Sequence, residues 1–238
     1  MNLHVVHLYP AEMNIYGDTG NRIILQRRAE WRGIDVNVSL VGLGEEIPQG
    51  DVDIIIGGGG QDAVQSSVQP DIQAKAQVLH DLAESGTVML MVCGLYQLFG
   101  RRFITVAKEE IKGIGIMPLE TQAGEQRLIG NTNVSSEWGE LVGYENHSGK
   151  TLLDDKKQAL GQVIKGAGNN GQDGTEGCVY KNIFGTYLHG PILSKNPVLA
   201  DELLKRALIR KYQTDIDLKP LDDNYESRAA TIAKTRTR

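Results

Sequence analysis

The sequence predicts an α/β fold of three layers, in which a mostly parallel sheet carries helices on both faces. Two observations support this prediction. Segments prone to form strands alternate with helical segments over the first half of the chain, and the inner strand segments are almost wholly apolar. Such alternation is typical of βαβ units, and strands covered on both faces are continuous apolar runs. Ligands of these sheets bind at the carboxyl ends of the strands.

The elements of the first half are delimited by glycine, proline and polar residues. The first strand segment ends at a proline and the first helical segment at a glycine, which are ordinary stop signals. An apolar run at 53–56 leads directly into Gly57–Gly60, and another at 88–92 leads into Cys93. The predicted strands are 3–9, 35–41, 53–56 and 88–92, and the predicted helices are 22–31 and 72–85.

Beyond about Gly113 the pattern changes to short strand segments separated by turns. A polar, glycine-rich stretch at 167–177 is typical of a loop, and an amphipathic helix is predicted at 197–210. We expect one domain over residues 1–212 and a polar C-terminal tail over 213–238 that could dock a partner. The short strand segments are 115–117, 127–131, 141–144, 178–180 and 183–189. The basic residues gathered toward the C-terminal end are Lys205, Arg206, Arg210, Lys211, Arg228, Lys234, Arg236 and Arg238.

The composition is that of a globular protein. Of 238 residues, 40% are hydrophobic and 23% charged, and no run approaches the roughly 20 apolar residues that span a bilayer. The formal net charge of −5 argues against nucleic acid as a partner. Two cysteines, Cys93 and Cys178, allow at most one disulfide, and the first residues lack the pattern of a signal peptide. We therefore expect a cytoplasmic protein with free thiols.

Cys93 lies at the predicted turn from strand to helix, in the run CGLYQLFG at 93–100. Most buried free cysteines behave as small hydrophobic residues. A sharp strand-to-helix turn, however, exposes its first residue at the edge of the sheet, as in a nucleophile elbow. The N-terminus of a helix also favours the thiolate. We therefore interpret Cys93 as a catalytic nucleophile.

The glycine run that follows the preceding strand could supply backbone N–H groups to an oxyanion. We predict an oxyanion hole formed by Gly58, Gly59 and Gly94. The alternative for such a run is a phosphate-binding loop, which requires G-x-x-x-x-G-K-[ST]. The Gly-Lys-Thr triplet at 149–151 has Tyr144 where the earlier glycine should be. We therefore expect no nucleotide loop, no metal site and no cofactor in this chain.

A cysteine nucleophile needs a base, and histidine is the usual one. His4 and His7 fall on the first predicted strand and His80 falls in a predicted helix, so we interpret them as structural or surface residues. His147 and His189 each lie where a strand segment gives way to a loop. We favour His189, in part because of a family resemblance.

Several motifs resemble those of the class I (triad) glutamine amidotransferases of the cobyric acid synthase type. The elbow Cys-Gly-x-Tyr-Gln-x-x-Gly matches 93–100, Tyr-x-His-Gly-Pro matches 187–191, and Gly-Tyr-Glu-x-His matches 143–147. The resemblance is closer still to the small glutaminase subunits that act with a MurT-like ligase in amidating lipid II. It extends over nearly the whole chain, through 14–21, Arg127-Leu128, 168–170 and 185–193. It implies the flavodoxin-like fold of that class.

The resemblance also implies roles for individual residues. Cys93 would attack the side-chain amide of glutamine to form a γ-glutamyl thioester, and His189 would shuttle the protons. Arg127 matches the substrate-binding arginine of the family, and its planar fork suits the α-carboxylate of glutamine because the two groups pair bidentately.

The chain departs from the family pattern in two places. Many elbows have a small residue two positions before the cysteine and glycine two positions after it, where this chain has Met91 and Leu95. The usual triad places a glutamate two residues after the histidine, where this chain has Pro191. Asp18, Glu145 or an acid from a partner subunit could orient the histidine instead, and a Cys–His pair without a third member is a further alternative.

The function implied is that of a glutaminase subunit that passes ammonia to a separate MurT-like subunit of the Mur-ligase type, within a heterodimer. ATP and Mg²⁺ would then bind to the ligase. The acceptor would be the D-glutamate of lipid II, which becomes D-isoglutamine during peptidoglycan synthesis. The alternatives are amidation of a corrinoid, a stand-alone cysteine hydrolase and a catalytically dead scaffold subunit.

Overall fold

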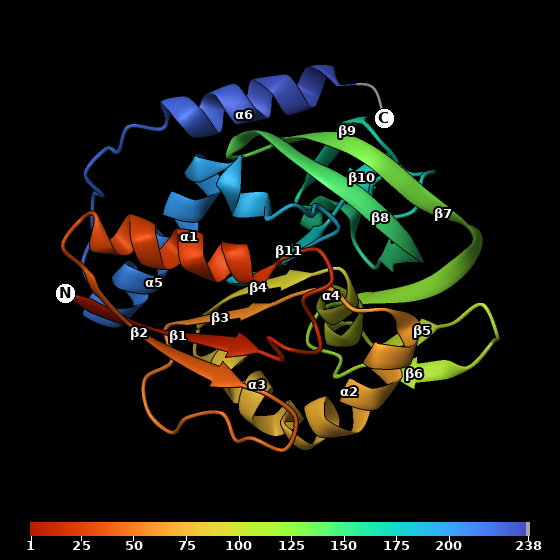
Figure 1. Ribbon diagram of the computed structural model, residues 1–238. Coiled ribbons are helices and arrows are strands. Elements are labelled where there is room, and N and C mark those ends of the chain that lie inside the picture. Colours follow the sequence, from red (N-terminus) through yellow and green to blue (C-terminus); the bar gives the residue numbers. More distant parts are fainter. Residues whose placement is uncertain (237–238) are drawn as a thin grey trace.

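The computed structural model describes residues 1–236 and contains two six-stranded sheets (Figure 1). Arg238, part of the basic C-terminal group, lies outside the described residues. The strands are β1 (Asn2–Leu8), β2 (Asp35–Val41), β3 (Ile54–Gly57), β4 (Val88–Val92), β5 (Arg102–Ile104), β6 (Glu110–Lys112), β7 (Leu119–Ser136), β8 (Gly139–Leu153), β9 (Gly161–Lys165), β10 (Thr175–Glu176), β11 (Cys178–Tyr180) and β12 (Ile183–Thr186). The helices are α1 (Thr19–Glu30), α2 (Asp62–Ala74), α3 (Ala76–Glu84), α4 (Gly94–Phe99), α5 (Pro197–Tyr212) and α6 (Asn224–Thr235), with short 3-10 turns η1 (Lys156–Gln158) and η2 (Ile192–Ser194).

The first sheet has the strand order β11-β12-β4-β3-β1-β2. Every neighbouring pair from β12 to β2 is parallel, and β11 is antiparallel at one edge. Helices α1 and α5 lie on one side of this sheet, and α2 and α3 lie on the other (Figure 1). The predicted three-layer α/β fold is therefore confirmed.

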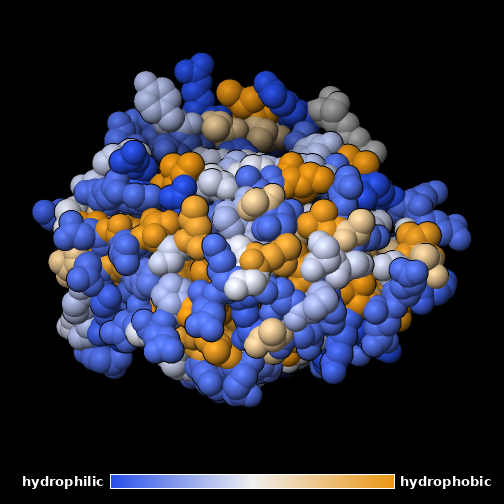
Figure 2. Space-filling view, turned by 60° about the horizontal axis from the view of Figure 1, so that its bottom comes forward, coloured by the Kyte–Doolittle hydropathy of each residue, from blue (hydrophilic) through white to orange (hydrophobic). Residues whose placement is uncertain are grey.

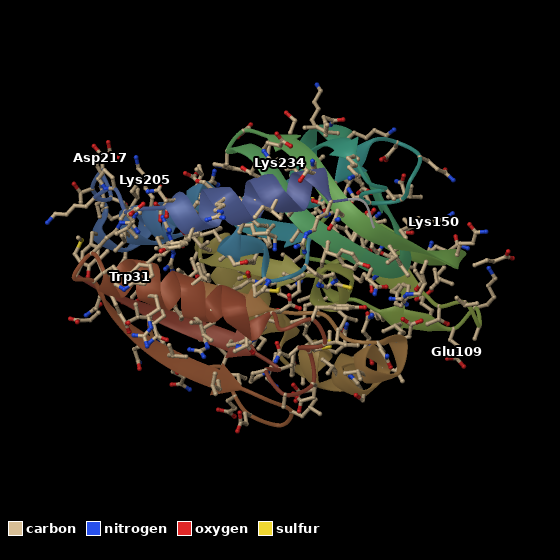
Figure 3. The ribbon with its side chains drawn as sticks, turned by 45° about the horizontal axis from the view of Figure 1, so that its top comes forward. Trp31, Glu109, Lys150, Lys205, Asp217 and Lys234 are labelled. Atoms are coloured by element: carbon tan, nitrogen blue, oxygen red, sulfur yellow. The ribbon has the colours of Figure 1, made fainter. Side chains whose placement is uncertain are left out.

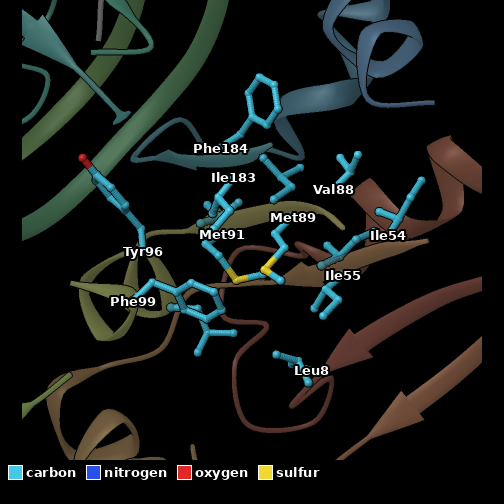
Figure 4. Packing of buried hydrophobic residues seen from close by; sticks show 14 of the residues in the cluster. Leu8, Ile54, Ile55, Val88, Met89, Met91, Tyr96, Phe99, Ile183 and Phe184 are labelled. Carbon is cyan, nitrogen blue, oxygen red and sulfur yellow. The ribbon is translucent and has the colours of Figure 1, made fainter. Parts of the chain in front are cut away.

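The core is centred on β4, which has a neighbour on each side and is buried along its whole length. Met89 and Met91 of β4 pack among Ile55, Ile183 and Phe99 (Figure 4). A strand without a solvent-facing side needs no polar positions, which explains the unbroken run VMLMV. The same burial fixes where the end of β4 lies, because close-packed interiors tolerate little displacement.

One predicted helix is placed too late in the sequence. The structure has α2 from Asp62 and α3 to Glu84 in place of a single helix at 72–85, with a break at Lys75. Pro70 inside α2 has no N–H for the helix ladder, which suits a helix that ends shortly afterwards. Val68 and Ile72 lie one turn apart and face the core, so the helical period was present in the sequence.

The second sheet, which the sequence did not predict as a separate layer, has the order β10-β9-β7-β5-β6, with β8 paired to β7. The short segments predicted at 127–131 and 141–144 lie inside the long antiparallel strands β7 and β8. The segment predicted at 115–117 forms no strand. A bulge between Ala123 and Leu128 interrupts the pairing of β7 with β8 and shifts its register.

The segment after α5 returns over α1 and then forms α6 across β7 and β8 (Figures 1 and 3). Arg28 of α1, almost fully buried, pairs with Asp201 and with Asp223 just before α6. At the other end of α6, Lys234 pairs with Glu140 at 2.8 Å. Ion pairs therefore fasten this polar helix, none of whose residues is buried.

The face of the molecule in Figure 2 shows small apolar patches dispersed among hydrophilic side chains. Within residues 1–236, none of the helices combines the length and the apolar character needed to cross a membrane.

Candidate active site

Strand register brings the two predicted catalytic residues to the same edge of the first sheet. Thr186, the last residue of β12, pairs with Val92, the last residue of β4. Cys93, which follows Val92 in the chain, donates its N–H to the carbonyl of Thr186 at 2.9 Å. His189 follows β12 by three residues. Parallel neighbours end side by side, so adjacency of β4 and β12 is what places a cysteine and a histidine together.

Cys93 occupies a strained backbone conformation, with φ 52° and ψ −101°. A residue with a side chain adopts such angles only where its surroundings enforce them, at a cost of about 1–3 kcal/mol. The angles belong to the sharp turn between β4 and α4, as a nucleophile elbow requires.

The unusual elbow residues Met91 and Leu95 are accommodated by Gly57 at the end of β3. A Cβ at Gly57 would lie 2.0 Å from Leu95 Cδ1 and 3.2 Å from Met91 Sδ. In other elbows, small residues beside the cysteine leave room for the close approach of strand and helix. Here the missing side chain of Gly57 in β3 leaves room for Met91 and Leu95.

His189 is almost fully buried, and its backbone is fixed to β8. Its N–H donates to the carbonyl of Tyr144 at 2.9 Å, and the N–H of Tyr144 donates to the His189 carbonyl at 3.2 Å. The ring of Tyr16 packs against the imidazole, with centroids 4.2 Å apart. Tyr16 belongs to the motif at 14–21 that resembles the family, but the sequence assigned it no role in the site.

The two candidate acids of this chain are divided between two histidines. Asp18 Oδ1 lies 3.7 Å from His189 Nδ1, and Asp18 Oδ2 accepts the N–H of Gly59 at 2.9 Å. Glu145 lies beside His147 instead, with Oε2 3.9 Å from Nε2. Asp18 is therefore the acid next to the predicted base.

Pro191 packs against the start of α1, close to Asp18. A Cβ at Gly20 would lie 2.2 Å from Pro191 Cγ, so the start of α1 packs directly on the residue that replaces the usual glutamate. Asp18 is the residue immediately before α1. The contact with Pro191 therefore lies two residues from the candidate acid.

Gly59 lies between the nucleophile and the histidine. A Cβ at this position would lie 3.1 Å from His189 Cε1, 3.2 Å from Cys93 Cβ and 3.6 Å from Asp18 Oδ2. The missing side chain of Gly59 is thus what lets all three groups converge.

The electrostatics favour a charged imidazole. Burial lowers the pKa of His189, but the charges of Cys93 and Asp18 outweigh it and raise the pKa to about 9. Within residues 1–236, neither ring nitrogen has a partner at hydrogen-bond distance. Catalytic hydrogen bonds are often long before substrate binds, so the absence of a short hydrogen bond to the imidazole is compatible with proton transfer.

The glycine loop presents its amides differently from the sequence prediction. The N–H of Gly59 is engaged by Asp18, and Gly58 packs against Met13 and Asp18. Gly60 lines the cavity at Cys93, and its nitrogen lies 3.0 Å from the position of a Cβ on Gly94. Gly60 and the start of α4 at Gly94 therefore lie close together beside the cavity, whereas the N–H of Gly59 is already bound to Asp18.

A cavity of about 600 Å³ opens above Cys93 between the two sheets. Arg127 of β7 lies in its wall, where Nε and Nη2 donate to the side chain and backbone of Asn146 at 3.0 and 2.9 Å. Gln65 and Gln97 form the inner wall, and Gln65 Nε2 donates to Gln97 Oε1 at 2.9 Å. The volume suits an amino acid, and nothing in the sequence pattern had singled out Gln65.

The other candidates are held in structural contacts. His147 lines the cavity, but it stacks on Tyr187 with centroids 3.6 Å apart, and its Nδ1 lies 2.7 Å from the Gly149 carbonyl. Burial and the charge of Arg22 lower the pKa of His7 to about 4. Burial raises the pKa of the Cys178 thiol to about 12, which keeps it protonated. His4 and His80 bind Ser39 and the Ile114 carbonyl, respectively.

Comparison with known proteins identifies relatives over most of the chain. A family model described as the CobB/CobQ-like glutamine amidotransferase domain matches residues 4–197. The GatD subunit of the glutamine-hydrolysing lipid II isoglutaminyl synthase of Streptococcus pneumoniae is 40% identical, covering 93% of this chain and 86% of that protein. The GatD subunit of Staphylococcus aureus is 38% identical, covering 97% and 94%. A probable cobyric acid synthase of Methanothermobacter thermautotrophicus is 29% identical over 81% of this chain and 40% of its own length.

Solved structures share the fold at low identity. PurLQS of Thermotoga maritima superposes with a TM-score of 0.60 at 15% identity, covering 90% of this chain and all of that one. A glutamine amidotransferase of the same organism has a TM-score of 0.53 at 15% identity, covering 98% and 93%.

Proposed function

Because the chain belongs to the CobB/CobQ-like glutamine amidotransferase family, we propose that it hydrolyses L-glutamine as the glutaminase subunit of an amide ligase. One observation carries the proposal: a strained, cavity-lining cysteine stands beside a buried histidine that has a carboxylate behind it. Nucleophile, base and orienting group in this order form the minimal machinery for acyl transfer.

In the proposed reaction, Cys93 Sγ attacks the side-chain carbonyl carbon of glutamine. The oxyanion receives hydrogen bonds from the backbone N–H groups of Gly60 and Gly94, which are worth several kcal/mol when pre-oriented. His189 gives a proton to the departing nitrogen, which leaves as ammonia while the γ-glutamyl thioester remains on the sulfur. His189 then takes a proton from water, which attacks the thioester and releases glutamate. Asp18 orients the ring and stabilises its positive charge.

Arg127 would hold the substrate by its α-carboxylate. Arg127 lines the cavity, and its guanidinium is held in place by Asn146. Charge-assisted pairs of this kind contribute about 1.5–3 kcal/mol. They distinguish free glutamine from a glutamine within a peptide.

The ammonia would pass to a separate MurT-like subunit of the Mur-ligase type, which binds ATP and Mg²⁺ and activates the carboxyl group to be amidated. The names of the two GatD relatives support a subunit role and lipid II as the acceptor. The cytoplasm, where lipid II precursors and ATP are both accessible, would be the site of action. Direct transfer is chemically reasonable because ammonia in neutral water is mostly ammonium, which is a poor nucleophile.

The experiment that tests the proposal uses the complex of this chain with its ligase subunit. Wild-type complex should amidate lipid II with either glutamine or ammonium as the nitrogen source. The Cys93→Ala complex should lose the reaction with glutamine and keep the reaction with ammonium, whereas the matched Cys178→Ala complex should keep both. Glutamate release by the Cys93→Ala complex at the wild-type rate would refute the nucleophile, and corrinoid amidation without lipid II amidation would refute the acceptor.

A further inference from the structure

Glu176 is a buried carboxylate for which the proposed reaction has no use. It lies in the two-residue strand β10 and is fully shielded from solvent. Its carboxylate accepts the N–H of Tyr187 at 2.7 Å and the hydroxyl of Thr186 at 3.1 and 3.2 Å. Burying a carboxylate is costly unless hydrogen bonds or a cation compensate, so a carboxylate at this position calls for an explanation.

Hydrogen bonds through Thr186 connect Glu176 to the backbone of Cys93 and to the turn that precedes His189. The carbonyl of Thr186 accepts the N–H of Cys93 at 2.9 Å, and its hydroxyl oxygen accepts the N–H of Leu188 at 3.0 Å. The same carboxylate thus fixes the residue that holds the nucleophile's amide and the turn that leads to His189.

Charge couples Glu176 to the site as well. Burial raises the pKa of Glu176 to about 7, while hydrogen bonds from Tyr187 and Thr186 and the charge of His189 lower it. Glu145, the other carboxylate that acts on it, raises its pKa. Tyr96 also faces this region, and burial raises the pKa of that phenol so that it stays neutral. The positive charge of His189 therefore favours the ionised form of Glu176, in addition to the hydrogen bonds from Tyr187 and Thr186.

We propose that Glu176 is a positioning residue for the Cys93–His189 pair, acting through the turn formed by Thr186 and Tyr187 and through its negative charge. This inference rests on the proposed function, and it assigns part of the work of the missing triad glutamate to a residue of β10 in the second sheet. Asp18 touches the ring, whereas Glu176 holds the backbone that carries it. Loss of the charge should reduce turnover without weakening glutamine binding.

The test compares Glu176→Gln with wild type in the assembled complex. A carboxamide keeps the size and can still accept the Tyr187 N–H, so the substitution mainly removes charge. We expect kcat for glutamine hydrolysis to fall about tenfold with KM within twofold. The rate of Cys93 alkylation by iodoacetamide would be followed by mass spectrometry across pH 5–9. The change in rate that accompanies loss of the His189 imidazolium proton should move to lower pH, because the imidazolium is less stabilised.

Two further variants separate positioning from a general effect on folding. Thr186→Val keeps the carboxylate but removes the hydroxyl that links it to the turn, and it should lower kcat with an unchanged alkylation profile. Asp53→Asn removes another buried carboxylate, which pairs with Lys211 of α5 away from the site, and it should leave that profile unchanged. Wild-type kcat in both Glu176→Gln and Thr186→Val would overturn the proposal. The proposed function itself would fail only if wild-type complex did not hydrolyse glutamine.

Discussion

Gly59→Ala adds a single methyl group at the point where nucleophile, histidine and acid converge. The new Cβ would lie 3.1 Å from His189 Cε1 and 3.2 Å from Cys93 Cβ, where ordinary contact begins at 3.4 Å. To restore ordinary contact with the added methyl group, His189 must move away from it by about 0.3 Å and Cys93 by about 0.2 Å. The backbone N–H that binds Asp18 is retained, so the perturbation is almost purely steric.

The expected cost falls on turnover rather than on folding. A misplacement of 1 Å can cost about 100-fold in rate, so 0.3–0.5 Å should lower kcat about four- to tenfold. Steady-state glutamate release by the complex measures kcat and KM, and thermal unfolding measures stability. Gly42→Ala is the matched control, because its Cβ would make ordinary contacts of 3.6 Å or more with Glu45. A Gly59→Ala enzyme with wild-type kcat and an unshifted melting temperature would show that the convergence around this glycine does not matter for catalysis.

Three other predictions concern the elbow, the substrate and the acid. Gly57→Ala should destabilise the fold by about 1–3 kcal/mol in urea unfolding, since its Cβ would meet Leu95, and the double variant with Leu95→Ala should cost less than the two single changes added together. Arg127→Ala should raise KM for glutamine about 10- to 100-fold with a smaller change in kcat; an unchanged KM would remove the α-carboxylate from this side chain. Asp18→Asn should lower the pKa of His189 from about 9, so the alkaline limb of activity should move to lower pH. In wild type, the stability from this raised pKa is fully present below about pH 6.5 and is lost as pH rises through about 9; a scan in which Asp18→Asn kept the wild-type dependence would contradict the pairing.

The parallel sheet and its functional edge could be predicted from the sequence because local chemistry determines them. An apolar run that ends in glycine or cysteine specifies both a buried strand and a turn, and 53–60 and 88–94 each contain such a run. The same local pattern places Cys93 at the end of a buried strand, and the family motifs favour His189 over His147 as the predicted base. The proximity of Cys93 and His189 follows from strand order, which the sequence does not state.

Features that depend on distant contacts were not predictable. The sequence left Asp18 and Glu145 as alternatives, and only the fold shows that Asp18 lies beside His189 and Glu145 beside His147. The compensation of Leu95 by Gly57 likewise becomes visible only when β3 and β4 are paired. The second sheet was missed because β7 and β8 are polar and twisted, and their alternation is interrupted by the bulge.

Helix α6 was also missed, for a different reason. Its residues are mostly exposed, so it lacks the apolar stripe by which a helix is usually recognised in a sequence. Its attachment depends on Asp223 and Lys234, whose partners Arg28 and Glu140 lie far away in the chain.

The most direct measurement is covalent labelling of the wild-type complex with a glutamine-like diazo-ketone, followed by peptide mass spectrometry. The mechanism predicts one adduct, on Cys93, whose formation is slowed by free glutamine and by the His189→Ala substitution. An adduct on the buried Cys178, or labelling of Cys93 that glutamine does not slow, would contradict the assignment of the glutamine-binding nucleophile.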